Sequence, residues 1–192
     1  DILLLPGNGK DSNQQWIQDV SDAVSESGFF KNVRTIRYKH WHLSGNAEME
    51  DVDHELAKVR QAVDDFAVEG EYVVFAKSVG SALYLRALSE GMRRPRAAVL
   101  AGIPMKNAEN PTFATVLGEA GFPAVLVGYT VPTLIIQNES ERFIRPDGLL
   151  AFLKQHGVTS CDVVTGIDPG HSYSVDVVVR HVFAHAARVM SR

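Results

Sequence analysis

The sequence predicts an α/β protein, specifically a three-layer α/β/α sandwich with a mainly parallel sheet of about six strands. Short apolar runs alternate with helical patterns along the chain, which is typical of consecutive βα units. The chain has 192 residues, 45% of them apolar, which suffices for one domain with a substantial core. Because no repeat, low-complexity tract or linker interrupts this pattern, we expect a single domain over residues 1–192.

The N-terminal part of the chain contains the first two expected strands. The first covers residues 2–5 and ends at the loop Pro6-Gly7-Asn8-Gly9. Ser12 and Gln15 then have the spacing of a capping box, which predicts that a helix begins there. The second strand is expected over residues 33–38.

The next expected helix has apolar residues at alternating spacings of four and three, which predicts one buried face. These residues are Val52, Leu56, Val59, Val63 and Phe66. A third strand over residues 72–75 and a helix over residues 79–90 follow.

The remaining apolar runs predict strands over residues 97–101, 133–137 and 161–165, with helices over 149–155 and 175–189. Residues 102–130 mix proline, glycine and apolar side chains, and we expect them to form a small lid or pocket wall. Its apolar residues suit either a pocket wall or core packing: Phe113, Val116, Leu117 and Phe122.

Composition narrows the choice of partners. The net charge is −4 and charges of both signs are interspersed, so nothing indicates a nucleic-acid partner. No apolar stretch approaches the roughly 20 residues of a membrane span. The single cysteine, Cys161, excludes an internal disulfide and is expected to be a buried, inert thiol. We see no signal peptide and expect a cytoplasmic protein acting on a small molecule, with the oligomeric state left open.

Ser78 is the first candidate functional residue. It follows an apolar strand, precedes a helical pattern, and has the small residues Ala76 and Gly80 two positions on either side. A sharp strand–serine–helix turn of this kind exposes a nucleophile. The backbone N–H of Val79 would then point at a developing oxyanion. The alternative is an ordinary turn in which Ser78 caps the helix.

An acid and a histidine follow in the order that a triad requires. Glu141 comes just after the strand over 133–137, where its carboxylate can accept an imidazole N–H. His171 lies in a Gly-His loop between the last strand and the last helix, where it can act as a general base. Glu139 and Asp168 are competing acids, although Asp168 better fits an Asp-Pro-Gly turn.

The placement of Ser78, Glu141 and His171 carries more weight than any one of them. Each falls at the carboxyl end of an expected strand, where sites gather in parallel sheets. We therefore predict that they form a catalytic triad. The pattern suggests no third metal ligand for His181 and His185, so we interpret them as helix-surface or packing residues. His40 and His42 could bind a metal or line the pocket mouth, but a plain loop fits them better, and we expect no metal site.

The loop Pro6-Gly7-Asn8-Gly9 permits three interpretations. A phosphate-binding P-loop is excluded because Leu4 stands where a glycine is required and Asp11 replaces the serine or threonine. A dinucleotide site has two of its glycines, and the basic segment Arg37-Tyr38-Lys39 suits a 2′-phosphate, so an NADP-binding protein is the rival function. In the third interpretation, which we prefer, the amide of Asn8 completes an oxyanion hole with Val79.

These residues resemble the α/β-hydrolase superfamily over nearly the whole chain. The early Leu-Pro-Gly-Asn-Gly and the Gly-His loop look most like the compact serine hydrolases of the retinoblastoma-binding-protein type. The resemblance implies a minimal α/β-hydrolase fold. It also implies hydrolysis of a small carboxylic ester or related acyl bond, without a cofactor, by a nucleophilic Ser78, a base His171 and an acid Glu141.

Three residues depart from the family pattern. Ala76 replaces the commoner glycine, Glu141 stands where aspartate is usual, and Lys77 directly precedes the nucleophile. Lys77 either favours an anionic substrate or faces solvent. Because the superfamily also includes inactive members, a hydrolase-like interaction module is the other alternative.

Overall fold

A computed structural model describes residues 1–43, 49–66, 70–105, 116–117 and 121–191. Within these residues, six strands form one sheet in the order β2-β1-β3-β4-β5-β6, and all neighbouring strands are parallel. The strands are β1 (Ile2–Leu5), β2 (Val33–Thr35), β3 (Val73–Lys77), β4 (Ala97–Ala101), β5 (Thr133–Asn138) and β6 (Cys161–Gly166). The expected fold class is therefore confirmed.

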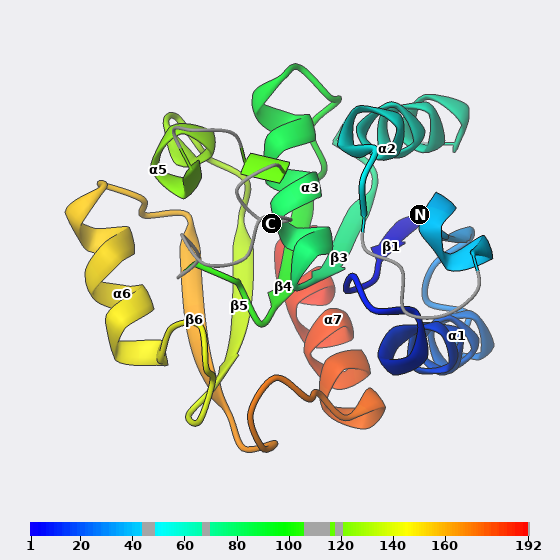
Figure 1. Ribbon diagram of the computed structural model, residues 1–192. Coiled ribbons are helices and arrows are strands. Elements are labelled where there is room, and N and C mark those ends of the chain that lie inside the picture. The colour runs from blue at the N-terminus through cyan, green and yellow to red at the C-terminus, as the bar shows by residue number, and fades with distance from the viewer. Residues whose placement is uncertain (44–48, 67–69, 106–115, 118–120, 192) are drawn as a thin grey trace.

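Helices cover both faces of the sheet (Figure 1). One face carries α1 (Lys10–Glu26) and α7 (Val175–Met190), which contact each other. The other face carries α2 (Val52–Phe66), α3 (Val79–Ser89), α5 (Gly121–Leu126) and α6 (Pro146–Gln155). Right-handed crossovers explain why α1 lies on one face and α2, α3, α5 and α6 lie on the other, because the chain moves towards one edge after β1 and towards the other edge from β2 onwards.

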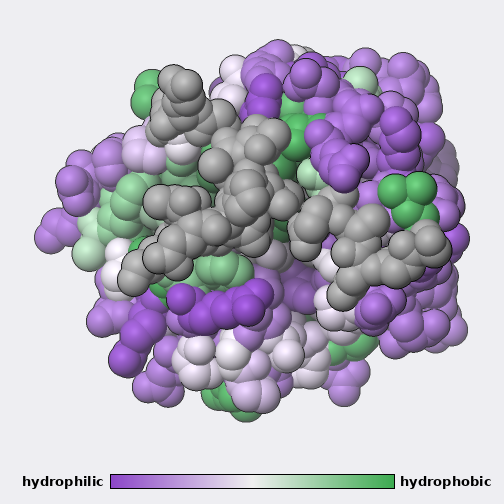
Figure 2. Space-filling model, viewed as in Figure 1, coloured by the Kyte–Doolittle hydropathy of each residue, from purple (hydrophilic) through white to green (hydrophobic). Residues whose placement is uncertain are grey.

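The core lies on both sides of the central strands. Every residue of β1, β3, β4 and β5 is buried, as expected for continuous apolar strands covered on two faces. On α2, the apolar stripe formed by Val52, Leu56, Val59 and Val63 is buried, which confirms the amphipathic pattern. The outward surface of α2 is largely hydrophilic (Figure 2).

The predicted start of the first helix is wrong. The helix α1 begins at Lys10, with Gly9 as its N-cap residue. Ser12 lies inside its first turn and donates to the Gly9 carbonyl over 3.3 Å, while Gln15 bonds forward to Asp19. The capping-box spacing therefore occurs here within a helix that has already started.

Two other boundaries differ from the expected ones by three residues, and the remaining differences are smaller. The strand β2 ends at Thr35, three residues early, and the chain continues into a 3₁₀ turn, η1 (Lys39–His42). The helix α6 begins at Pro146 rather than at residue 149. Proline is favoured at the first helical position, and Arg145 before it is extended, with φ −75° and ψ 159°.

Only part of the expected lid is described. Phe113 lies outside the described residues, as do the rest of 106–115 and 118–120. Val116 and Phe122 are buried in the hydrophobic core, and Leu117 packs against it. Cys161 is half-buried, and burial raises the pKa of its thiol to about 11.

The strand order creates one topological switch point. After β1 the chain moves outward to β2, whereas after β3 it moves in the other direction to β4. The ends of β1 and β3 are neighbours, with Leu5 paired to Ala76. Ligand sites in open α/β sheets lie outside the strands at such a point, so the Pro6–Gly9 loop and Ser78 meet where a site is expected. Among the described helices, none has the length and apolar character needed to cross a membrane.

Candidate active site

Ser78 occupies a strained turn between β3 and α3. Its φ of 53° and ψ of −120° make it the one non-glycine residue with a positive φ in the described chain. Its backbone N–H donates to the Ala101 carbonyl over 2.9 Å, which fixes the turn to the end of β4. Although Ser78 stands at the N-cap position, its hydroxyl makes no capping hydrogen bond, so the interpretation as a simple helix cap lacks its defining contact.

Gly80 allows α3 to approach the end of β1. A Cβ atom at this position would lie 2.6 Å from the carbonyl oxygens of Leu5 and Pro6. Any larger residue would therefore separate the serine turn from the Pro6–Gly9 loop. Val79, the first residue of α3, has a backbone N–H that the helix itself leaves without an acceptor.

His171 is hydrogen-bonded to a buried carboxylate. Its Nδ1 lies 2.8 Å from Oε2 of Glu141, whose side chain has no exposed surface, and the Tyr173 hydroxyl donates to the same oxygen over 2.9 Å. Burial raises the Glu141 pKa, but hydrogen bonds from His171 and Tyr173 outweigh it and hold the pKa below its ordinary value. Glu141 is thus ionised and accepts, so Nδ1 of His171 donates.

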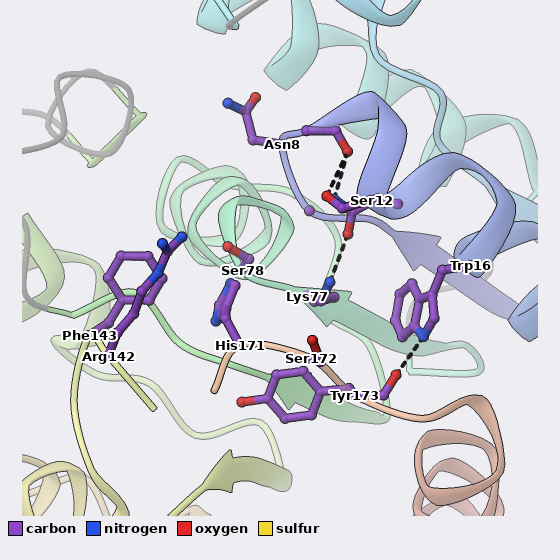
Figure 3. Close-up of a pocket in the computed structure, with 13 residues that line it drawn as sticks. Asn8, Ser12, Trp16, Lys77, Ser78, Arg142, Phe143, His171, Ser172 and Tyr173 are labelled. Atoms are coloured by element: carbon purple, nitrogen blue, oxygen red, sulfur yellow. Dashed lines mark hydrogen bonds between the residues drawn. The ribbon is translucent and has the colours of Figure 1, made fainter. Parts of the chain in front are cut away.

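This tautomer leaves Nε2 of a neutral His171 as the basic atom. The atom is buried and has no hydrogen-bond partner among the described residues. The imidazole and the Ser78 side chain both line one pocket, and in the view of Figure 3 the imidazole is drawn directly below Ser78.

The two competing carboxylates are placed differently. Asp168 accepts hydrogen bonds from the backbone N–H and hydroxyl of Ser174, over 2.7 and 2.8 Å, and so shapes the start of α7. The side chain of Glu139 is exposed, and its backbone N–H donates to Gly166. Of the three acids that the sequence offered, Glu141 is the one bonded to His171.

Two residues that the sequence did not single out hold the His171 loop. The Asn138 amide is fully buried and donates to the carbonyls of Gly170 and Ser172, over 3.0 and 2.6 Å, on either side of His171. Gly102 has φ +62°, and a Cβ there would lie 2.7 Å from Cε1 of His171. The one sequence signal for Asn138 was that a polar residue ends an apolar strand. Its hydrogen-bond partners, Gly170 and Ser172, lie more than 30 residues further along the chain, so this signal does not reveal its role.

The Pro6–Gly9 loop is braced from η1. The Asn8 carbonyl accepts from Nε2 of His40 over 2.9 Å and from the Trp41 indole over 2.8 Å. The buried Tyr38 hydroxyl donates to Pro6 over 2.7 Å and its ring stacks on His40. His40 therefore contributes to the shape of the loop.

The histidine pair and the basic segment that could suggest a metal site or an NADP site make other contacts in the structure. Nε2 of His185 contacts the Pro132 carbonyl, and the described residues contain no group of three or more His, Cys, Asp or Glu suited to a metal ion. Arg37 donates to Gln18 and Lys39 forms an ion pair with Asp51. Both basic side chains thus have partners outside the Pro6–Gly9 loop.

A pocket of about 520 Å³ opens at these residues. Ser78 and His171 line it together with the Gly7–Gly9 segment, and its walls include Trp16 and Phe143. Lys77 and Arg142 also line it, and no Asp or Glu does so among the described residues. The site thus combines a hydroxyl carried on a strained backbone turn, an imidazole oriented by a carboxylate, and a basic lining.

No protein-family model and no curated protein matches the chain. Solved structures do match. An α/β hydrolase from Sphaerobacter thermophilus superposes with TM-score 0.65 at 12% identity, covering 96% of this chain and 92% of that one. A structure described with the metagenome-derived lipolytic enzymes LipS and LipT gives 0.71 at 15%, covering 100% and 94%. Est1E from Butyrivibrio proteoclasticus, with ferulic acid bound, gives 0.70 at 16%, covering 100% and 89%. The chain has the α/β-hydrolase fold.

Proposed function

We propose that this chain, which has the α/β-hydrolase fold, is a serine hydrolase that cleaves a small carboxylic ester or related acyl bond. The observation that carries the proposal is one pocket lined by a strained Ser78 and by a His171 that is hydrogen-bonded to the buried Glu141. If Ser78 were only a helix cap and His171 only a surface residue, nothing would require the two to line one pocket or His171 to be bonded to a buried carboxylate.

The first half of the proposed cycle acylates the enzyme. Nε2 of His171 takes the proton from the Ser78 hydroxyl as its Oγ attacks the acyl carbonyl. Glu141 holds the imidazole in the required tautomer and stabilises the imidazolium that forms. His171 then gives the proton to the leaving alcohol, and the acyl group remains on Ser78.

The second half releases the acid. His171 removes a proton from water, the resulting hydroxide attacks the acyl-enzyme, and Ser78 recovers its proton when the intermediate collapses. In both halves the carbonyl oxygen becomes negative, and the backbone N–H groups of Val79 and Asn8 are the proposed donors to it. The proposed cycle uses only these groups and water.

The pocket dimensions favour a small substrate. A volume of about 520 Å³ lies in the range of ordinary small-molecule sites. Trp16 and Phe143 provide apolar walls for a short acyl chain or a ring. Esters, thioesters and amides share the acyl carbonyl that this chemistry attacks, and activated esters are the simplest to test.

The test is hydrolysis of a panel of 4-nitrophenyl esters with acyl chains of different lengths. We expect turnover by the wild type, with Ser78→Ala and His171→Ala each slower by roughly 10⁴-fold or more. Circular dichroism should show that both variants keep the fold. Absence of turnover by folded wild type on esters and thioesters would favour an inactive interaction module and reject the proposal.

A further inference from the structure

Among the described residues that line the pocket, Lys77 and Arg142 are the two cations that the proposed reaction does not use, and Lys77 is the one adjacent to Ser78. It ends β3, immediately before Ser78, and it lines the same pocket. Its side chain is not directed to solvent, because the residue is only 6% exposed. Of the two roles that the sequence left open for Lys77, facing solvent is therefore excluded.

The ammonium group has few partners. Its Nζ donates to Oδ1 of Asn13 over 2.8 Å and lies 4.7 Å from the centre of the Trp16 ring. Asn13 is its one hydrogen-bond partner in the described part of the chain, although an ammonium carries three donors. No described carboxylate forms an ion pair with Lys77, and the Glu141 carboxylate, whose charge acts on Lys77, is bonded to His171 and Tyr173.

This arrangement carries an energetic cost. Removing a cation from water without pairing it with an anion is unfavourable, and the other four residues of β3 are apolar and buried. Burial lowers the pKa of Lys77 to about 8, against the raising effect of the Glu141 charge, so the group is still mostly charged at neutral pH. A ligand anion would supply the missing partner.

The rest of the described lining is compatible with an anion. Arg142 is a second cation at the pocket, and the described lining residues include no carboxylate that would repel one. Figure 3 shows Lys77 and Trp16 on one side of Ser78 and His171, with Arg142 and Phe143 on the other. The chain as a whole has net charge −4, so this local excess of positive charge does not reflect its composition.

We propose that Lys77 makes the enzyme selective for acyl substrates that carry a carboxylate, which the Lys77 ammonium binds on the Trp16 side of the pocket. The apolar part of such a substrate would lie against Trp16, while its acyl carbonyl reaches Ser78. This inference rests on the proposed hydrolase function and specifies its substrate class.

A purely structural role for Lys77 is the competing explanation. The Asn13 amide that it contacts also donates to the Gly9 carbonyl over 2.7 Å, and a Cβ at Gly7 would lie 2.7 Å from Oδ1 of Asn13. Losing Lys77 could thus disturb the Pro6–Gly9 loop. That disturbance would slow charged and neutral substrates alike, whereas loss of an anion site would slow charged substrates selectively.

The experiment compares charged and neutral members of matched ester pairs. One pair is the mono-4-nitrophenyl ester of adipic acid and its methyl ester, with the carboxylate in the acyl part. The other is 4-butyryloxybenzoate and its methyl ester, with the carboxylate in the alcohol part. The quantity measured is the charged-to-neutral ratio of kcat/KM for wild type, Lys77→Met and, as a control for loss of an exposed lysine, Lys154→Met.

We expect Lys77→Met to lower this ratio at least tenfold in one of the pairs, and Lys154→Met to leave it unchanged. An equal loss for both members of each pair, or an unchanged ratio, would overturn the proposal. If Lys77→Met fails to fold, the pH dependence of the charged-to-neutral ratio of wild type tests the proposal instead. Its ratio should fall as the pH rises through about 8, and a flat ratio would overturn the proposal. The other charged or titratable groups that line the pocket, His171, Arg142 and Tyr173, and the Glu141 carboxylate bonded to His171, are common to both members of each pair.

A binding measurement separates this proposal from the proposed function. Thermal unfolding of the Ser78→Ala variant is recorded with and without adipate. The same measurement is made on the double variant Ser78→Ala/Lys77→Met. Stabilisation that depends on Lys77 supports the anion site even if wild type hydrolyses no ester, in which case only the hydrolase proposal fails. Hydrolysis of neutral esters without Lys77-dependent stabilisation or selectivity leaves the hydrolase proposal intact and overturns the anion site.

Discussion

The carboxylate of Glu141 accepts a hydrogen bond of 2.8 Å from Nδ1 of His171, and the Glu141 side chain is completely buried. This contact determines which imidazole nitrogen carries the proton, because an ionised carboxylate can only accept. The remaining nitrogen, Nε2, is then available to take a proton from Ser78. The proposed chemistry at Ser78 therefore depends on a residue that does not line the pocket.

Glu141→Gln should lower kcat/KM by roughly 10²–10⁴-fold, because an amide can donate to Nδ1 and favour the wrong tautomer. The matched control is Glu139→Gln, which removes an exposed charge two residues away and should leave turnover unchanged. Steady-state kinetics on one activated ester measures both. Equal rates for Glu141→Gln and wild type would show that another group orients His171.

Gly102→Ala should lower turnover more than its effect on stability explains. The added Cβ would lie 2.7 Å from Cε1 of His171, so the ring would have to move. The control is Gly157→Ala, which has a similar φ of +66° and nothing within 4 Å of the added Cβ. Both variants should lose about 1–2 kcal/mol of unfolding free energy through backbone strain. Turnover by Gly102→Ala at the level of Gly157→Ala would contradict the placement of the imidazole.

Ser78→Gly should be more stable than Ser78→Ala, because glycine tolerates the φ of 53° that strains other residues. Both variants lack the hydroxyl, so their comparison isolates the backbone. We expect a difference of about 1 kcal/mol in chemical denaturation. Equal stabilities would indicate that the turn stores no strain at Ser78.

Lys77 should give wild type a pH dependence of stability that Lys77→Met lacks. Its pKa is lowered from 10.5 to about 8 by burial, so above pH 8 the folded state releases a proton that the unfolded state still binds. Stability then rises with pH across this window. Relative to Lys77→Met, the unfolding free energy of wild type should increase by about 1–2 kcal/mol between about pH 7.5 and about pH 9.5. A difference that does not change with pH would mean that the pKa of Lys77 is not lowered.

The sheet and its buried face could be predicted because their signals are local and repeated. The stripe from Val52 to Val63 places one residue on the buried face at nearly every turn of α2, and the continuous apolar runs of β1 and β3 predict central strands. The start of α1 could not be predicted in this way. Ser12 has the same spacing to Gln15 whether it caps a helix or lies within one.

The meeting of Ser78, Glu141 and His171 in one region was predictable because the carboxyl ends of parallel strands share one edge. The contacts that support them were not. Asn138 reaches carbonyls more than 30 residues away, and His40 reaches Asn8 across a similar separation. Such pairs depend on how loops from different strands pack, which no local pattern records. The burial of Lys77 likewise depends on Asn13 and Trp16 of another element.

The most direct measurement of an activated serine is intact-mass analysis after treatment with a fluorophosphonate probe. Wild type, Ser78→Ala and His171→Ala are treated side by side, with circular dichroism as the control for folding. A single adduct on wild type and none on either variant is the expected result. No adduct on folded wild type, or an adduct that persists in Ser78→Ala, would contradict the assignment of Ser78 as the nucleophile.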